Sequence, residues 1–272
     1  MGSNPPVRRD DSMMPIPNEI IKNFELSNDA VLAYVFVKIH TYSMFYDSCL
    51  FTIPHIVDQI RGYTNSHSVF CRTAQALEEL AEKGILKIAR EDATNWRIFM
   101  QSFRPIRGRY VLVDPDALRS IMDCRARGKA TVLRYYLLLL ANISPSRKVC
   151  IKEEGWFAKQ LKVSPKSIAT YNEYLETLKL IYVYRPAEMY QSNVYGRYEN
   201  MRQVEKEGEK ICSRRRRYEK ANEKRRYAAM YRSALRGCSY DIDTLKNIVN
   251  HLDKKYDLSP LIDKIKEMED ID

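Results

Sequence analysis

Apolar residues recur at every third or fourth position in two long stretches of the chain, at about 27–42 and 129–142. This spacing gathers them on one broad face of an α-helix, so each stretch is predicted to form a buried helix. The corresponding apolar positions are Val31, Leu32, Val35, Phe36 and Ile39 in the first stretch and Val132, Leu133, Tyr136, Leu137 and Leu140 in the second. Their common pattern indicates that one structural unit occurs twice.

The segments around the two helices also match in order. A brief amphipathic helix precedes each long helix, and a β-prone piece, a short helix, a polar turn, a third helix and two β-prone segments follow it. They lie at 16–24, 49–53, 54–61, 62–65, 66–83, 85–89 and 96–100 in the first copy and at 113–121, 149–151, 154–161, 162–163, 164–179, 180–184 and 194–198 in the second. This order predicts a mainly α (α+β) fold with two tandem winged helix-turn-helix domains.

The repeat divides the chain into five expected segments. They are a flexible N-terminal tail at 1–13, the two domains at 14–110 and 111–200, a basic helical arm at 201–236 and an acidic helical tail at 237–272. Ser164 followed by Pro165 is typical of a helix start, and Gly84 of a helix end. The tail is predicted to be a small helical hairpin that folds back on the body, self-associates into a homodimer or receives another protein.

Charge adds a direction to this picture. The 272 residues include 45 Lys and Arg against 35 Asp and Glu, a formal net charge of +10. The net charge is +1 over 1–110, +5 over 111–196, +8 over 197–236 and −4 over 237–272. Such basicity favours a polyanion as partner, nucleic acid first and an acidic membrane surface second. No apolar run is long enough to span a membrane and the N-terminus is polar, so a cytoplasmic location is expected.

The third helix of each copy is expected to enter the major groove of double-stranded DNA, with its N-terminal residues near the bases. Polar and basic side chains that point away from the predicted apolar stripes are the candidates, because they suit phosphates and base edges. They are Asn65, Ser66, His67, Ser68, Arg72 and Gln75 in the first copy and Ser164, Lys166, Ser167, Thr170 and Tyr174 in the second. Asn172 is expected between the two faces of its helix. The first domain is nearly neutral, which leaves protein contacts open as its role.

Further candidates lie in the hairpins and in the arm. Wing residues commonly contact phosphate or reach the minor groove. The wing candidates are Arg90, Arg97, Arg185, Asn193 and Arg197, and those of the arm are Arg214, Arg215, Arg216 and Arg217. Two interpretations of the arm stay open, a solvated helix and a helix that lies along a phosphate backbone.

The sequence lacks the motifs of common catalytic sites. It has no glycine-rich phosphate loop followed by Lys and Ser or Thr, and its four histidines are scattered. No two of the six cysteines lie closer than 22 positions, which excludes a zinc knuckle or a redox pair and favours reduced thiols. We therefore expect a protein that is not an enzyme and has no metal and no cofactor.

The second copy resembles winged-helix replication initiators and replisome organisers of plasmids, phages and integrative elements in Gram-positive bacteria. The resemblance rests on WFAKQL at 156–161, VSPKSI at 163–168, LETLKLIYVYR at 175–185 and NVYGRY at 193–198. It implies sequence-specific binding to repeated origin sites in duplex DNA and recruitment of host replication proteins, for which the tail is the candidate. The residues themselves leave two alternatives open, a transcriptional regulator of the same fold and a protein-interaction scaffold.

Overall fold

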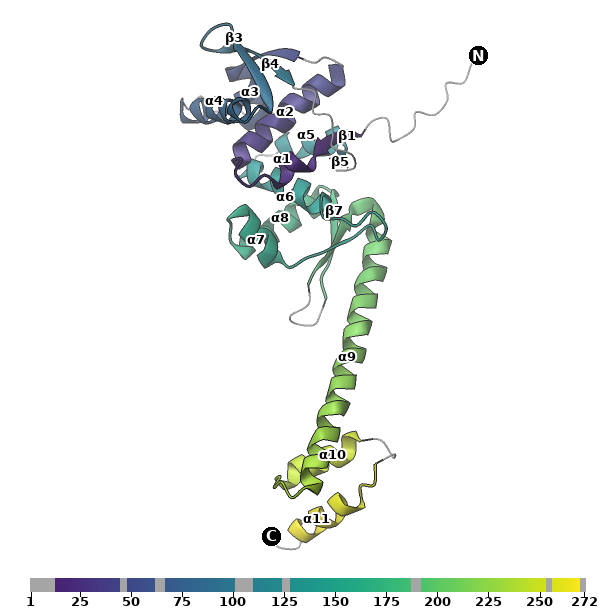
Figure 1. Ribbon diagram of the computed structural model, residues 1–272. Coiled ribbons are helices and arrows are strands. Elements are labelled where there is room, and N and C mark those ends of the chain that lie inside the picture. The colour runs from purple at the N-terminus through teal and green to yellow at the C-terminus, as the bar shows by residue number, and fades with distance from the viewer. Residues whose placement is uncertain are drawn as a thin grey trace, which may run out of the picture. The chain divides into compact units, whose positions relative to one another are not determined.

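The computed structural model describes residues 13–44, 48–61, 67–100, 110–123, 128–186, 192–252 and 256–269. These residues are mainly helical and include three small antiparallel sheets, so the α+β class is confirmed (Figure 1). Contacts divide the chain into two compact units, Met1–Gly208 and Glu209–Asp272. The predicted N-terminal tail falls outside the described residues, apart from Met13.

The first unit contains the same order of elements twice. The first repeat consists of β1 (Met14–Pro17), α1 (Asn18–Lys22), α2 (Asn28–Met44), β2 (Ser48–Thr52), α3 (Ile53–Arg61), α4 (His67–Glu82), β3 (Leu86–Arg90) and β4 (Asn95–Met100). The second consists of β5 (Tyr110–Val113), α5 (Pro115–Asp123), α6 (Lys129–Leu140), β6 (Cys150–Ile151), α7 (Glu154–Leu161), α8 (Pro165–Thr177), β7 (Ile181–Tyr184) and β8 (Val194–Arg197). The strand orders are β2-β4-β3 and β6-β8-β7, so in each repeat the last strand lies between the other two.

Local signals in the sequence set several helix boundaries. The Ser164 hydroxyl accepts a hydrogen bond from the Ser167 amide at 3.1 Å and caps α8, as predicted. The Ser27 hydroxyl does the same for α2 by accepting from the Ala30 amide at 3.0 Å. Gly84 follows α4 with φ of 68°, a left-handed conformation that glycine adopts without steric cost. Short-range chemistry therefore defines where these helices begin and end.

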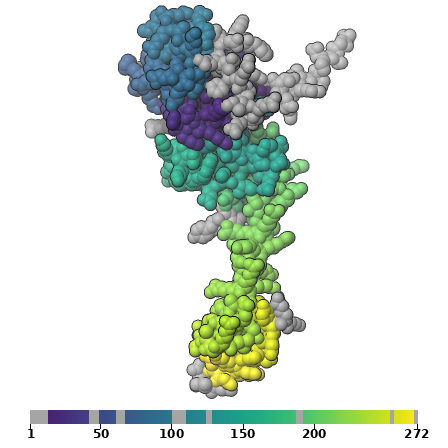
Figure 2. Space-filling view, viewed as in Figure 1, coloured from purple at the N-terminus to yellow at the C-terminus, as the bar shows by residue number. Residues whose placement is uncertain are grey.

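One hydrophobic core serves both repeats. In α6, 10 of 12 residues are buried, and 30–37 of α2 are buried without interruption. Helices with so little polar surface must be covered on every side, and α2 and α6 pack against each other. In the space-filling view the first repeat, purple to blue, lies directly on the teal second repeat (Figure 2). The two repeats are thus one packed body.

The strands β1 and β5 join the repeats in a register that has twofold symmetry. Met14 pairs with Val113, Pro15 with Leu112 and Ile16 with Val111. The helices that follow begin at Asn18 and Pro115, so equivalent residues of the two repeats differ by 97 in number. Met14 is thus equivalent to Val111 and Ile16 to Val113, so the pair Met14–Val113 is equivalent to the pair Val111–Ile16. Pro15 is equivalent to Leu112, its own partner in the ladder. A local twofold axis through that central pair therefore relates the two strands.

A buried arginine adds a polar link between the repeats. The Arg134 side chain on α6 donates to the backbone carbonyl oxygens of Leu26 and Asn23, each at 2.6 Å, and to Asn28 Oδ1 at 3.1 Å. Its guanidinium also lies over the Phe24 ring. Burial lowers the pKa of Arg134, and these acceptors compensate for the water that the cation loses.

The 3₁₀ turn η2 (Tyr198–Asn200) leads into α9 (Met201–Leu235), whose start is part of the first unit. There Tyr182 donates to Glu205 Oε1 at 2.9 Å, and Gly208 lies directly against the Tyr184 ring. A Cβ atom at position 208 would overlap that ring. The close approach of helix and hairpin explains why a glycine interrupts an otherwise helix-favouring sequence.

In the second unit, the last turns of α9 pack with α10 (Ile242–His251) and α11 (Ser259–Glu269). The buried residues of this cluster are Tyr231, Ala234, Leu245, Ile248, Leu261 and Ile265. Asp241 caps α10 by accepting from the Thr244 amide at 2.7 Å, which lowers the pKa of its carboxyl. The end of the predicted arm and the predicted tail therefore share one small core.

Two glycine substitutions should have opposite effects on stability. Ala in place of Gly normally stabilises a helix by up to about 1 kcal/mol. We expect this gain for Gly155→Ala in α7, where a Cβ meets nothing within 4 Å. Gly208→Ala should instead lower the free energy of unfolding by about 1–3 kcal/mol, because overpacking against Tyr184 outweighs the helix propensity. Urea denaturation of both variants checks this, and equal stabilisation would contradict the packing described here.

Candidate nucleic-acid interface

The N-terminal end of α8 exposes the side chains that the sequence pattern predicted there. Ser164, Lys166 and Thr170 are exposed, and Ser167 is half-buried. The Ser164 and Ser167 hydroxyls are 2.9 Å apart, and the Thr170 hydroxyl donates to the Lys166 carbonyl at 3.2 Å. On the opposite side Ile168 and Leu175 are buried in the core. Tyr174 differs from expectation, since it is half-buried against the core.

Two further lysines lie beside this helix end and were missed by the sequence pattern. Lys159 is in the last turn of α7 and Lys162 is in the turn between α7 and α8, and both are exposed like Lys166. Three ammonium groups thus occur within eight positions, next to the helix terminus whose dipole also favours anions. The sequence contains a signal for both lysines, because a basic residue at the end of one predicted helix and another in the following turn lie close to the start of the next helix.

A polar network inside the second repeat holds α8 in place. Asn172 is fully buried, accepts from the Tyr135 hydroxyl and donates to Glu154 Oε1 at 3.1 Å. Asn193 donates to the same Glu154 oxygen at 3.0 Å and to the Tyr195 hydroxyl at 3.4 Å. The prediction for Asn172, as a residue between two faces, was therefore wrong, whereas the prediction of Asn193 as a wing contact stays a prediction. Glu154 is half-buried, and these two amides supply donors to its carboxylate.

In the first repeat the equivalent helix, α4, presents fewer basic groups. His67, Ser68 and Gln75 are exposed as predicted, whereas Asn65 and Ser66 lie outside the described residues. Arg72 is exposed, but its guanidinium is 2.6 Å from the Asp29 carboxylate on α2. The buried face of α4 also contains a polar residue, because Thr73 is buried and its hydroxyl donates to the Val69 carbonyl at 2.9 Å.

The arginines of the two hairpins are directed at acceptors within the protein. Arg90 pairs with Glu78 and lies over the Trp96 ring, while Arg97 donates twice to Glu91 at 3.0 and 3.1 Å.

In the second hairpin Arg185 bonds to both carboxylate oxygens of Glu176, which raises the pKa of its guanidinium. Arg197 donates to the Leu112 carbonyl at the edge of β5. Nearby acceptors thus hold each of these four side chains, and contact of the wings with DNA stays a prediction.

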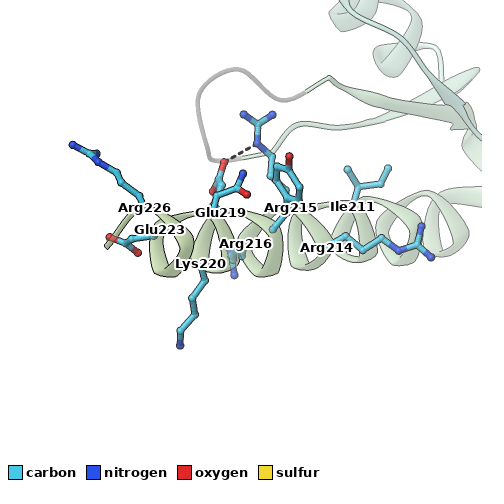
Figure 3. Close-up of a pocket in the computed structure, with 10 residues that line it drawn as sticks. Ile211, Arg214, Arg215, Arg216, Glu219, Lys220, Glu223 and Arg226 are labelled. Atoms are coloured by element: carbon cyan, nitrogen blue, oxygen red, sulfur yellow. Dashed lines mark hydrogen bonds and ion pairs between the residues drawn. The ribbon is translucent and has the colours of Figure 1, made fainter. Parts of the chain in front are cut away.

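The four arginines predicted in the arm lie in the second unit and are all exposed. Arg214, Arg215 and Arg216 follow one another around the helix α9 (Figure 3), and Arg217 is the next residue. Arg215 is paired with Glu219 one turn further on, at 2.8 Å. The surface here is open and is formed by residues of this one helix.

Two other kinds of site are missing from the described residues. No group of three or more His, Cys, Asp or Glu among them is placed to hold a metal ion. No helix in the described part of the chain has both the length and the apolar character needed to cross a membrane.

Lysines in left-handed backbone conformations allow the site to be tested. Lys162 has φ of 55°, which costs a residue with a Cβ about 1 kcal/mol relative to glycine. We expect Lys162→Gly to raise the free energy of unfolding by up to that amount and to weaken DNA binding, with the salt slope reduced by about 1. Lys179→Gly is the matched control, because Lys179 has the same φ of 55° beyond the other end of α8. It should stabilise the protein without changing its affinity, and an equal loss of affinity would contradict the assignment.

Comparison with known proteins identifies no family for this chain. No protein-family model matches it, and no curated protein matches it significantly.

Proposed function

We propose that the chain is a sequence-specific double-stranded DNA-binding protein and that each repeat is a winged helix-turn-helix domain. The helix pairs α3–α4 and α7–α8 correspond to the helix-turn-helix, and the hairpins β3–β4 and β7–β8 to the wings. The repeated element order and the shared strand order support this interpretation. A fold of this kind serves many functions, so the site must supply the rest of the argument.

The exposed N-terminal end of α8 is the observation that carries the proposal. It combines an oriented helix dipole, three exposed lysines (Lys159, Lys162 and Lys166) and the hydroxyls of Ser167 and Thr170. Lysines and helix N-termini bind phosphate, and hydroxyls bind base edges in the major groove. The buried Asn172 and the half-buried Glu154 hold this helix from behind, which provides the rigid support that base recognition needs. A membrane surface fits less well, because it requires an exposed apolar face.

The two repeats make unequal contributions in this proposal. The second repeat presents the cluster of exposed lysines, whereas in the first repeat Arg72, Arg90 and Arg97 are each paired with a carboxylate. Neutralised guanidinium groups attract phosphate weakly. The same ion pairs favour a second function for the first repeat, namely contact with another protein.

The biological role that we propose is replication initiation for a plasmid, phage or integrative element, which rests on the sequence resemblance of the second repeat. Transcriptional regulation through the same fold is the alternative. Enrichment of bound fragments from the source genome, followed by sequencing, separates the two roles. Repeats at a replication origin support initiation and promoter sites support regulation, whereas recovery of no preferred sequence would refute specific DNA binding.

A pair of charge-neutralising variants tests the unequal roles of the repeats. Lys166→Gln should weaken binding to an enriched duplex by about tenfold and reduce the salt slope by about 1, because one phosphate contact is lost. Arg72→Gln should change the affinity less than about twofold, since an exposed, already paired cation contributes little. Fluorescence anisotropy over a range of salt concentrations measures both. Equal losses in the two variants would contradict the leading role of the second repeat.

A further inference from the structure

The middle of α9 is a helix without a buried side. Every residue from 213 to 226 is exposed, so this segment has no buried side chain, although Glu223 Oε1 lies 4.0 Å from His251 Nε2 of α10. The segment has eight basic and two acidic residues, a net charge of +6. Ala221 and Tyr218 are its only apolar side chains, and Tyr218 is 65% exposed. Neither hydrophobic burial nor tertiary contact accounts for this composition.

Four of the basic residues of α9 share one side of the helix. Lys210, Arg214, Arg217 and Lys224 are separated by four, three and seven positions, which brings them onto one face. At a rise of about 1.5 Å per residue this basic stripe is about 21 Å long.

Both acidic residues of the segment lie on the opposite face, where Glu219 accepts from Arg215 at 2.8 Å. Figure 3 shows Arg214 and Lys220 projecting away from the side that holds Arg215 and Glu219. The two acidic residues between 213 and 226 therefore do not interrupt the stripe.

Close like charges in this part of α9 are unfavourable for the helix alone. Like charges four positions apart destabilise a helix by about 0.2–0.5 kcal/mol a pair, and α9 contains the pairs Lys210–Arg214, Arg216–Lys220 and Lys220–Lys224 against the favourable pair Arg215–Glu219. A bound polyanion would turn this repulsion into attraction. The composition of the segment thus fits a helix that has a polyanionic ligand.

The shape of the stripe indicates which polyanion. A membrane-binding helix needs an apolar face, and a protein partner needs buried apolar anchors, neither of which residues 213–226 offer. A nucleic-acid strand instead presents a line of phosphates, with one charge about every 3.4 Å of helix axis in duplex DNA. We propose that the basic stripe of α9 is a second nucleic-acid site, which binds the phosphodiester backbone irrespective of base sequence. It goes beyond the proposed function, because it uses different residues in a different unit of the chain.

The test uses the full-length triple variant Arg214→Gln, Arg217→Gln and Lys224→Gln, in which glutamine keeps a high helix propensity. Binding to a scrambled 20-bp duplex should weaken at least tenfold at about 0.1 M salt, and the salt slope should fall by about 0.9 for each charge removed. Thermal unfolding should be unchanged or occur at higher temperature, since the mutations relieve repulsion. An unchanged salt slope in this folded variant would overturn the proposal.

A matched variant separates a local site from overall charge. Lys22→Gln, Lys87→Gln and Lys266→Gln remove the same charge from exposed positions outside the stripe and should leave the slope unchanged. An equal fall in slope would show that only net charge matters, and would overturn the proposal.

Single-stranded (dT)20 and phosphatidylserine vesicles complete the comparison. If the stripe variant loses binding to the duplex or to (dT)20, the result shows whether the stripe binds double-stranded or single-stranded nucleic acid. If it loses only vesicle binding, the proposal is overturned.

The two nucleic-acid proposals can fail separately. If α8 engages DNA only at its specific site, the phosphate contact of Lys166 exists only in that complex. Lys166→Gln should then reduce the preference for the enriched fragment over the scrambled duplex and keep most of the affinity for the latter. The stripe variant should keep the preference and lose affinity for both. Absence of any sequence preference in the unmodified protein, together with a stripe-dependent salt slope, would refute only the function proposed for the repeats.

Discussion

Mutual burial of α2 and α6 is the constraint from which the arrangement of the first unit follows. Neither helix has a polar face that water could cover, so each repeat is incomplete without the other. The cation of Arg134 strengthens this dependence, because backbone carbonyls of the first repeat are among its acceptors. Loss of these acceptors in the packed protein would leave a buried charge without partners, which is far more costly than the loss of a surface ion pair. The two candidate DNA-binding helices are therefore held by one rigid core.

Local patterns predicted the elements well and their long-range pairing poorly. The spacing of apolar residues and the helix-capping residues located α2, α6 and α8, because the residues that produce these signals lie within a few positions of each other. The partner of Arg72 is Asp29, 43 positions away, and no periodic pattern contains that relation. The buried Thr73 shows a related limit, because a hydroxyl that bonds to its own helix backbone can replace an apolar residue in a core. The pairing of β1 with β5 across the repeats was likewise invisible in the sequence.

The positive charge that is available to bind an anion is distributed differently from the basic residues themselves, because some of these residues are already paired with carboxylates. Net charge counts Arg185 and Lys166 equally, yet the first is bonded to Glu176 and the second is exposed beside two other lysines. Lys162 of this group also adopts a left-handed backbone conformation, which glycine would adopt without cost, so a residue with a cation occupies a position where the backbone favours glycine.

The twofold register of β1 and β5 has a consequence for assembly. Two identical subunits related by such an axis would form a dimer whose integrity falls on dilution. In this protein a single polypeptide contains both halves, so their association is intramolecular and independent of protein concentration. Covalent fusion also releases the halves from the requirement to be identical. The first repeat can then have arginines that are paired with carboxylates while the second has a group of exposed lysines. A homodimer with symmetric subunits cannot have this difference between its halves.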